Sequence, residues 1–426
     1  TKYSGVTYEE EVHVLGAPEF VLRDDFDEYK EEIEGYAGKG NRVLVFGTYD
    51  GELDGKALTG KVTPLGYVLL ANPIRKEAPE TFAYFAEQGV EVKVISGDNP
   101  LTVSEVAKEA GIANADRYVD AATLHSDAEI ADAVANYTVF GRVTPDQKRK
   151  FVHALKDQGK TVAMTGDGVN DSPALKKADV GFAMGSGTEV AKEAGDIVIL
   201  DDNFLSIKQA ILYGRTIYNS ICRFIVFQLS INFSAVAINL LAPFLGIEKP
   251  LTIIQILWIN LIMDTLAALA FGGEPALDRY LEEAPKERSA PIVSSSMLTK
   301  IILGGAYTTL LSLMLFLWGP LKDLFRPHAE ALPLYTGFFC TYVFLAVMNA
   351  FNVRVDSVNL FDHLTKNRGF IEINAMIIVI QVIMTYVGGR VLRVVPLTLG
   401  EWGTVLLLSL SILVVGTLFK VIAQNH

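Results

Sequence analysis

Hydrophobic positions divide the chain at about residue 205. Before that point, short runs of Val and Ile alternate with glycines and charged segments, which is typical of a domain in which strands alternate with helices. After it, six apolar segments are long enough to cross a membrane as helices. We expect these spans at about 218–246, 251–271, 298–319, 335–352, 371–389 and 403–421. The pattern predicts a globular part joined to a multi-pass membrane domain.

Two units of strand followed by loop stand out in the globular part. Residues 92–95 (Val-Lys-Val-Ile) predict a buried parallel strand, which is followed by the turn 96–98 and by a helix beginning near Leu101. Residues 161–164 and the loop 165–168 (Thr-Gly-Asp-Gly) repeat this arrangement. The repetition predicts a doubly wound α/β sheet that binds its ligand at the carboxyl ends of the strands.

Asp167 lies between glycines at the end of the second predicted strand, in the run Thr-Gly-Asp-Gly-Val-Asn-Asp-Ser-Pro-Ala-Leu over residues 165–175. A carboxylate in this place suits Mg²⁺, which keeps most of its water and takes one or two protein carboxylates. Asn170 can hydrogen-bond phosphoryl or water oxygens, and Asp171 can orient a ligand or tune Asp167. The alternative is a simple Asx turn, but an eleven-residue run is more specific than a bare Gly-Asp-Gly.

Polar residues inside the predicted spans are candidates for an ion pathway, because such residues are unfavourable in hydrocarbon. Asn260 and Asp264 are four residues apart and are expected to share a helix face, from which their oxygens could ligate a hard cation. Asn232 in the preceding span is a further candidate ligand. Asn239 in that span is interpreted more simply as a hydrogen-bonding residue between helices.

The charge distribution bears on partners and on orientation. A formal net charge of -12 argues against nucleic acid as a partner, because phosphate backbones require clustered Lys and Arg. Loops on the side of the globular part carry Arg279, Lys286, Arg288, Lys300, Arg354, Lys366, Arg368 and Lys420. Opposite loops carry Lys249, Lys322, Arg326, Arg390 and Arg393. The bias predicts a cytoplasmic globular part and spans surrounded by membrane lipid.

Several strings resemble those of the P-type ATPases, ion pumps built on a haloacid-dehalogenase-like phosphorylation domain. The run 165–175 is similar to the family's magnesium-binding loop. Ser96, Gly97 and Asp98 match the family's Thr-Gly-Asp phosphate loop, and the Ser hydroxyl can still donate to a phosphoryl oxygen. The resemblance implies an α/β Rossmannoid phosphorylation domain, part of an α+β nucleotide-binding domain, and an all-α membrane domain of six helices.

Residues 140–148 (Phe-Gly-Arg-Val-Thr-Pro-Asp-Gln-Lys) resemble the family segment whose Lys offsets charge on a phosphorylated aspartate. On that resemblance Lys148 would lie near the transferred phosphoryl group and Arg142 at a nucleotide-contacting position. Asp167 would hold Mg²⁺, so that ATP and Mg²⁺ are the implied cofactors.

Residues 16–19 (Gly-Ala-Pro-Glu) and Arg42 resemble the last parts of the family's nucleotide-binding domain, with Arg42 as the candidate phosphate-binding side chain. Two positions depart from the family. Leu15 replaces a Lys, which removes a cation from the adenine pocket, and Asn72 replaces the first Asp of the hinge. The expected organisation is 1–72 for the end of the nucleotide-binding domain, 73–206 for the phosphorylation domain and 207–426 for membrane helices equivalent to the fifth to tenth.

The family forms a covalent phosphate on the Asp of Asp-Lys-Thr-Gly-Thr, a string that this sequence does not contain. The resemblance therefore implies that a missing N-terminal half supplies the nucleophile, the actuator domain and the first four membrane helices. We expect this chain to be inactive without that partner.

The first two spans resemble the fifth and sixth helices of calcium pumps, most like the plasma-membrane type. Where two-site pumps have a Glu, this chain has Ala235 and, three residues before Asn349, Ala346. Without those carboxylates a second Ca²⁺ would lack charge compensation, so the resemblance implies ATP-driven transport of one Ca²⁺ per cycle across the cell membrane. The alternatives are a pump for another divalent cation such as Mn²⁺, and a non-catalytic membrane subunit or regulator.

Overall fold

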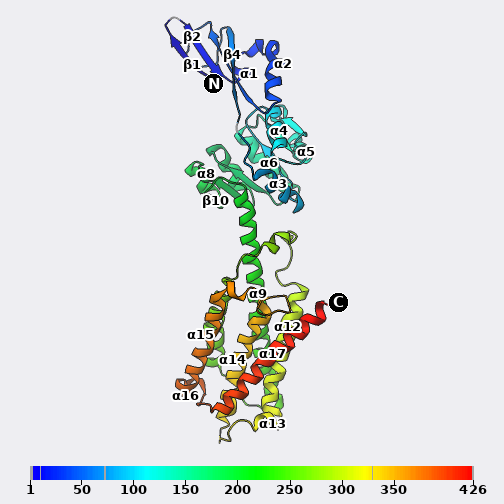
Figure 1. Ribbon diagram of the computed structural model, residues 1–426, viewed down its shortest axis with the longest axis vertical. Coiled ribbons are helices and arrows are strands. Elements are labelled where there is room, and N and C mark those ends of the chain that lie inside the picture. Colours follow the sequence, from blue (N-terminus) through cyan, green and yellow to red (C-terminus); the bar gives the residue numbers. More distant parts are fainter. Residues whose placement is uncertain (1–2, 10, 72, 329, 425–426) are drawn as a thin grey trace. The chain divides into compact units, whose positions relative to one another are not determined.

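A computed structural model describes residues 3–9, 11–71, 73–328 and 330–424 (Figure 1). The chain divides into two compact units, Thr1–Ala210 and Ile211–His426, and the division falls within helix α9 (Leu205–Leu241). It lies close to the membrane-domain boundary predicted at residue 207. The other predicted boundary, Asn72, lies outside the described residues. Each unit has hydrophobic cores of its own.

The first part of the first unit is an antiparallel sheet covered on one face by helices. Its strands are β1 (Tyr3–Tyr8), β2 (Glu11–Gly16), β3 (Arg42–Tyr49) and β4 (Val62–Leu70), in spatial order β1-β2-β3-β4. The helices are α1 (Pro18–Val21), the 3₁₀ turn η1 (Arg23–Asp25) and α2 (Phe26–Ala37). Val14 and Val45 are fully buried between sheet and helices, whereas Phe46 on the other face is exposed. This alternation is that of strands with one face in the core.

Parallel strands form the rest of the first unit. One sheet has the order β5-β7-β6, with β5 (Val94–Ile95), β6 (Tyr118–Asp120) and β7 (Val139–Gly141). The other has the order β10-β9-β8, with β8 (Ala163–Gly166), β9 (Val180–Met184) and β10 (Ile197–Ile199). The helical elements are α3 (Ala78–Glu87), α4 (Pro100–Glu109), η2 (Ala121–Thr123), α5 (Asp127–Asn136), α6 (Pro145–Asp157), η3 (Val169–Asp171), α7 (Ser172–Lys177) and α8 (Glu189–Ala194).

Both predicted strand-and-loop units are present, as β5 with its loop and as β8 with its loop. The α/β fold class is confirmed, but the described strands form two three-stranded sheets in place of one continuous sheet. Within these residues β5 and β8 each lie at the edge of their sheet. The two edge strands are also the two that lead directly into the predicted phosphate loops.

Among the residues that the structure describes, six helices are long and apolar enough to cross a membrane, as the sequence predicted. These candidate spans are Leu205–Leu245, Ile253–Gly272, Ser295–Leu317, Leu332–Arg354, Arg368–Val387 and Leu399–Ala423. Their elements are α9, η4 (Ala242–Leu245), α10 (Ile253–Trp258), the π-helical turn η5 (Ile259–Met263), α11 (Asp264–Gly272), α12 (Ser295–Leu317), α14 (Leu332–Arg354), α15 (Arg368–Val387) and α17 (Leu399–Gln424). The connecting elements are η6 (Asp278–Glu282), α13 (Gly319–Lys322), η7 (Leu364–Lys366) and α16 (Gly389–Leu392).

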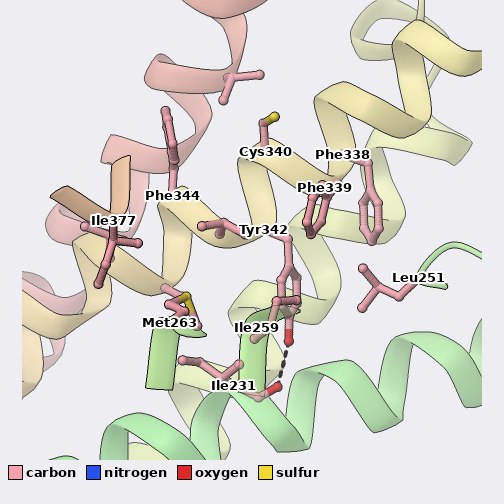
Figure 2. Close-up of a cluster of buried hydrophobic side chains, with 14 of the residues drawn as sticks. Ile231, Leu251, Ile259, Met263, Phe338, Phe339, Cys340, Tyr342, Phe344 and Ile377 are labelled. Atoms are coloured by element: carbon pink, nitrogen blue, oxygen red, sulfur yellow. Dashed lines mark hydrogen bonds between the residues drawn. The ribbon is translucent and has the colours of Figure 1, made fainter. Parts of the chain in front are cut away.

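Helix α14 is the centre of this unit. It contacts α12, α15 and α17, and 83% of its apolar window is buried, against at most 39% in the other spans (Figure 1). Figure 2 shows Tyr342 of α14 pointing toward α9, where its hydroxyl donates to the Ile231 carbonyl at 2.7 Å, whereas Phe344 points away from α9 and stacks on Trp402 of α17. This packing fixes α9, which carries the predicted ligand Asn232, against α14.

Candidate phosphate and cation sites

Asp171 brings together the polar residues predicted around Asp167. Its carboxylate is 5% exposed, and one oxygen, Oδ1, accepts a hydrogen bond from Lys148 Nζ at 2.7 Å. The other oxygen, Oδ2, accepts from the backbone N–H groups of Asp167 at 3.3 Å and Gly168 at 3.2 Å. A side chain at Gly166 would place its Cβ 2.5 Å from Asp171 Cβ, so only glycine fits there. Asp171 therefore joins the phosphate loop to Lys148.

The local sequence explains why Lys148 reaches this loop. Thr144 and Gln147 form a capping box at the start of α6, and Pro145 occupies the first turn. Lys148 follows directly, so the first turn of α6 presents its ammonium to Asp171. Contact of Lys148 with a phosphoryl group stays a prediction.

The Asp167 and Asn170 side chains are exposed at the end of β8. Their oxygens are hard ligands, and Asp167 presents a carboxylate beside a second one, Asp171, whose charge Lys148 already balances. The described residues contain no group of three or more His, Cys, Asp or Glu side chains that could enclose a metal. This donor set fits Mg²⁺, which takes one or two carboxylates and keeps several waters.

The Ser96-Gly97-Asp98 loop is held by its own backbone and by the segment after β7. Ser96 Oγ accepts from the Asp98 N–H at 3.1 Å. The Ser96 carbonyl accepts from the Val143 N–H at 2.9 Å, and the Asp98 carbonyl accepts from the Arg142 N–H at 2.8 Å. Arg42 Nε lies 3.6 Å from Asp98 Oδ1. The structure thus brings Arg42, the first phosphate loop and the backbone of Arg142 together.

The Arg142 side chain is engaged by two carboxylates. Its guanidinium donates to Asp120 Oδ2 at 2.6 Å and to Glu19 Oε1 at 2.5 Å. Burial lowers the pKa of Arg142, but hydrogen bonds to Glu19 and Asp120 outweigh it, and the net shift is upward. The residue has φ +52°, a left-handed conformation that non-glycine residues seldom adopt. A nucleotide contact by Arg142 stays a prediction.

Sequence reasoning did not identify Glu19 and Asp120 as partners of Arg142. Glu19 was only part of the Gly-Ala-Pro-Glu string, and Asp120 was not considered. Asp120 could have been found from its place at the end of a strand that pairs in parallel with β7. The carboxyl ends of parallel strands lie at the same edge of a sheet, which is where ligands bind.

Leu15, which stands where the family has a Lys, lies opposite Phe46 in the antiparallel sheet. The His13 ring stacks on Phe46 with 5.7 Å between ring centroids and 15° between planes. Leu15, His13 and Phe46 therefore form an apolar and aromatic surface on the sheet face away from α2. The departure from the family replaces a cation by an apolar side chain on this surface.

Asp264, the first residue of α11, is 3% exposed within the membrane unit. Its Oδ2 accepts a hydrogen bond from Gln228 Nε2 on α9 at 3.4 Å. Its Oδ1 is buried without a hydrogen-bond partner among the residues that the structure describes. An ionised carboxylate in such surroundings is strongly unfavourable unless a cation accompanies it.

Asn260 and Asp264, which are predicted to share a helix face, differ in exposure. Asn260 lies within the π-helical turn η5 and is exposed, whereas Asp264 is buried. The i to i+5 hydrogen bonding of this turn widens the helix directly before Asp264. Such turns occur often at functional sites, and they carry no signal in hydrophobic periodicity.

The polar residues of α9 have different roles. Asn232 is half-buried, and Asn239 donates from Nδ2 to the Ala235 carbonyl of its own helix at 2.9 Å. The neighbouring-helix bond considered for Asn239 is therefore replaced by a bond within α9. Gln228, which donates to Asp264, was missed by sequence reasoning. Its signal was its position four residues before Asn232, because that spacing puts both amides on one face.

Comparison with known proteins covers both units. Residues 248–422 match the family described as cation transporting ATPase, C-terminus, and residues 5–179 match haloacid dehalogenase-like hydrolases. A second haloacid dehalogenase-like family matches residues 148–211.

Relatives named as calcium-transporting ATPases align with most of the chain. Putative calcium-transporting ATPase 13, plasma membrane-type, of Arabidopsis thaliana is 35% identical over 408 residues, which are 93% of this chain and 40% of that protein. Calcium-transporting ATPase 2 of Schizosaccharomyces pombe is 32% identical over 424 residues, 94% of this chain and 33% of that protein. The chain thus spans 40% or less of the length of these two relatives. The chain is thus similar to cation-transporting ATPases in both its globular and its membrane unit.

Proposed function

We propose that this chain is the C-terminal part of an ATP-driven calcium pump of the cell membrane, with its globular unit in the cytoplasm. The observation that carries the proposal is Asp264, a carboxylate buried in a candidate membrane span with one oxygen unpartnered among the described residues. The same chain holds Asp167, Asp171 and Lys148 in one loop arrangement suited to phosphate and Mg²⁺. The names of the relatives support calcium as the transported ion.

In the globular unit, each predicted residue has a role set by its surroundings. Asp167 would hold Mg²⁺, which neutralises charge on a transferring phosphoryl group. Asp171 orients the Asp167 loop through two backbone N–H groups and holds Lys148 beside it. The Ser96 hydroxyl would bind a phosphoryl oxygen, and Arg42 the nucleotide phosphates.

The nucleophile would come from the N-terminal half, on a strand that ends in Asp-Lys-Thr-Gly-Thr. Edge strands β5 and β8 each present unpaired backbone groups within the described part of the chain, and each runs into a phosphate loop. One added parallel strand could pair with both and deliver its carboxyl end between the loops. The actuator domain and four further helices would belong to the same partner, and this chain alone would not hydrolyse ATP.

In the membrane unit, Asp264, Asn232 and Asn260 would ligate Ca²⁺ through oxygen atoms. Ala235 and the buried Ala346 supply no carboxylate, so we propose one Ca²⁺ per cycle. Alternate opening of this site to each side of the membrane would follow phosphorylation and its reversal.

The test is ion-stimulated phosphorylation by ATP in the full-length protein that contains this chain. Asp264→Ala should abolish the stimulation, whereas Asn239→Ala, which removes an amide bonded within its own helix, should preserve it. Unchanged stimulation in Asp264→Ala would remove Asp264 from the cation site. Stimulation by Mn²⁺ in preference to Ca²⁺ would identify a manganese pump, and its absence with every cation would favour a non-catalytic subunit.

A further inference from the structure

Buried carboxylates in the membrane unit differ in their partners. The Glu274 side chain, 4% exposed, lies 3.5 Å from Arg354, and Glu401, 2% exposed, lies 3.0 Å from Arg326. Asp264 is as deeply buried, yet within the described ranges its carboxylate has no cationic partner and one hydrogen-bond donor, Gln228. The donor on Asp264 is therefore neutral where the other two sites use arginine.

The Gln228 hydrogen bond makes the two oxygens of Asp264 unequal. The amide N–H donates to Oδ2 at 3.4 Å, while Oδ1 has no donor in the described structure. A carboxylate restrained at one oxygen can turn less freely about its side-chain bonds. The bond from α9 thus sets the direction in which Oδ1 presents its lone pairs.

A neutral donor also leaves the charge of Asp264 uncancelled. An arginine or lysine in place of Gln228 would satisfy the carboxylate but would repel a divalent cation and compete for both oxygens. Gln228 satisfies one oxygen and keeps the full negative charge available. Orientation without neutralisation is what a site that binds and releases a cation requires.

We propose that Gln228 is a positioning residue of the cation site, which orients Asp264 so that Oδ1 faces the bound ion. The proposal rests on the proposed function, because it assumes that Asp264 ligates the transported cation. Asn232 lies four residues further along α9, on the same helix face, and would approach the ion from the same side as Gln228.

The experiment measures equilibrium binding of Ca²⁺ to the full-length protein, without ATP. Gln228→Leu keeps the approximate size of the side chain and removes the donor. Because a hydrogen bond to a charged group is lost, Ca²⁺ affinity should fall about tenfold to a hundredfold. Nucleotide affinity should not change. Asn239→Leu is the matched control, because it removes an amide from the same helix, and it should bind Ca²⁺ normally.

A second variant separates positioning from general polarity. Gln228→Asn keeps an amide but is one methylene too short to reach Asp264, so it should also bind Ca²⁺ weakly while unfolding at the wild-type temperature in calcium-free buffer. If Gln228→Leu does not fold, Ca²⁺ binding to Gln228→Asn provides the test. Wild-type Ca²⁺ affinity in Gln228→Asn or Gln228→Leu overturns the positioning role and leaves the pump proposal intact. Wild-type binding in Asp264→Asn would instead overturn the proposed function.

Discussion

Asp171 in the globular unit and Asp264 in the membrane unit are both buried carboxylates, with 5% and 3% of their surface exposed. Asp171 is fully satisfied by the Lys148 ammonium and two backbone N–H groups. Asp264 has one neutral donor, and its other oxygen is unpartnered among the described residues. The first carboxylate is therefore part of the architecture of a loop, whereas the second is suited to receive a mobile cation.

The difference has an energetic basis. Removing one member of a buried ion pair leaves an uncompensated charge and is strongly destabilising, while removing a buried charge that has no counter-ion relieves the fold. Substitutions at the two sites should thus have opposite effects on stability, and both should abolish the proposed transport.

The largest effect on stability should come from Lys148→Met, which leaves Asp171 buried without its ammonium. The free energy of unfolding should fall by about 3 kcal/mol, and phosphorylation by ATP should be lost. Lys150→Met, on the same helix but in exposed ion pairs with Asp127 and Asp146, is the control and should unfold like the wild type. Equal stability of the Lys148 and Lys150 variants would contradict the structural role of Asp171.

Asp264→Asn should not destabilise the protein when calcium is absent, because it removes a charge that lacks a counter-ion among the described residues. Glu401→Gln makes the matched comparison in the same unit, since Glu401 accepts hydrogen bonds from the backbone and side chain of Arg326. Glu401→Gln should therefore lower the free energy of unfolding by about 2 kcal/mol. Thermal unfolding in detergent without Ca²⁺ compares the two. A larger loss in Asp264→Asn than in Glu401→Gln would show that Asp264 is a structural residue.

Gly166→Ala tests the close packing of Asp171 against its loop. The new methyl group would meet Asp171 Cβ at 2.5 Å, so the loop must shift at a cost of about 1 kcal/mol or more. Gly35→Ala in α2 is the control, since nothing lies within 4 Å of the added carbon. In chemical unfolding, Gly166→Ala should be less stable than Gly35→Ala. Mg²⁺-dependent phosphorylation should fall only in Gly166→Ala. Wild-type phosphorylation in Gly166→Ala would mean that the loop tolerates the shift.

The smallest effect is expected at Asp146, an exposed carboxylate paired with Arg149 at 2.9 Å. The hydrogen bond from Arg149 lowers the pKa of Asp146 despite the opposing effect of desolvation. A lowered pKa in the folded state contributes stability above the unfolded-state pKa, and the contribution disappears as the pH falls through the folded-state value. Asp146→Asn should therefore unfold almost like the wild type at neutral pH. A clear loss of stability there would show that exposed pairs matter as much as Lys148–Asp171.

Features set by local sequence were predictable. The six spans follow from the length of the apolar runs, and the start of α6 follows from the Thr144, Pro145 and Gln147 signals. The individual residues of the phosphate loops followed from the family resemblance. The contacts that join them were not predictable, because they depend on how distant segments pack.

Long-range and irregular features account for what sequence reasoning missed. Gln228 and Asp264 are 36 residues apart, and Arg142 and Glu19 are 123 apart, so no spacing rule links them. The π-helical turn before Asp264 has no signature in the apolar periodicity. The described parallel strands form two three-stranded sheets because of which strands pair, and strand propensity alone does not determine pairing.

The most direct test of the role of Asp264 is the amount of Ca²⁺ bound per phosphorylation site in the full-length protein, for the wild type and for Asp264→Asn. One Ca²⁺ per site in the wild type and none in the variant is the predicted result. Two Ca²⁺ per site would contradict the single site inferred from Ala235 and Ala346. Undiminished binding in Asp264→Asn would contradict the central claim that this buried carboxylate holds the transported cation.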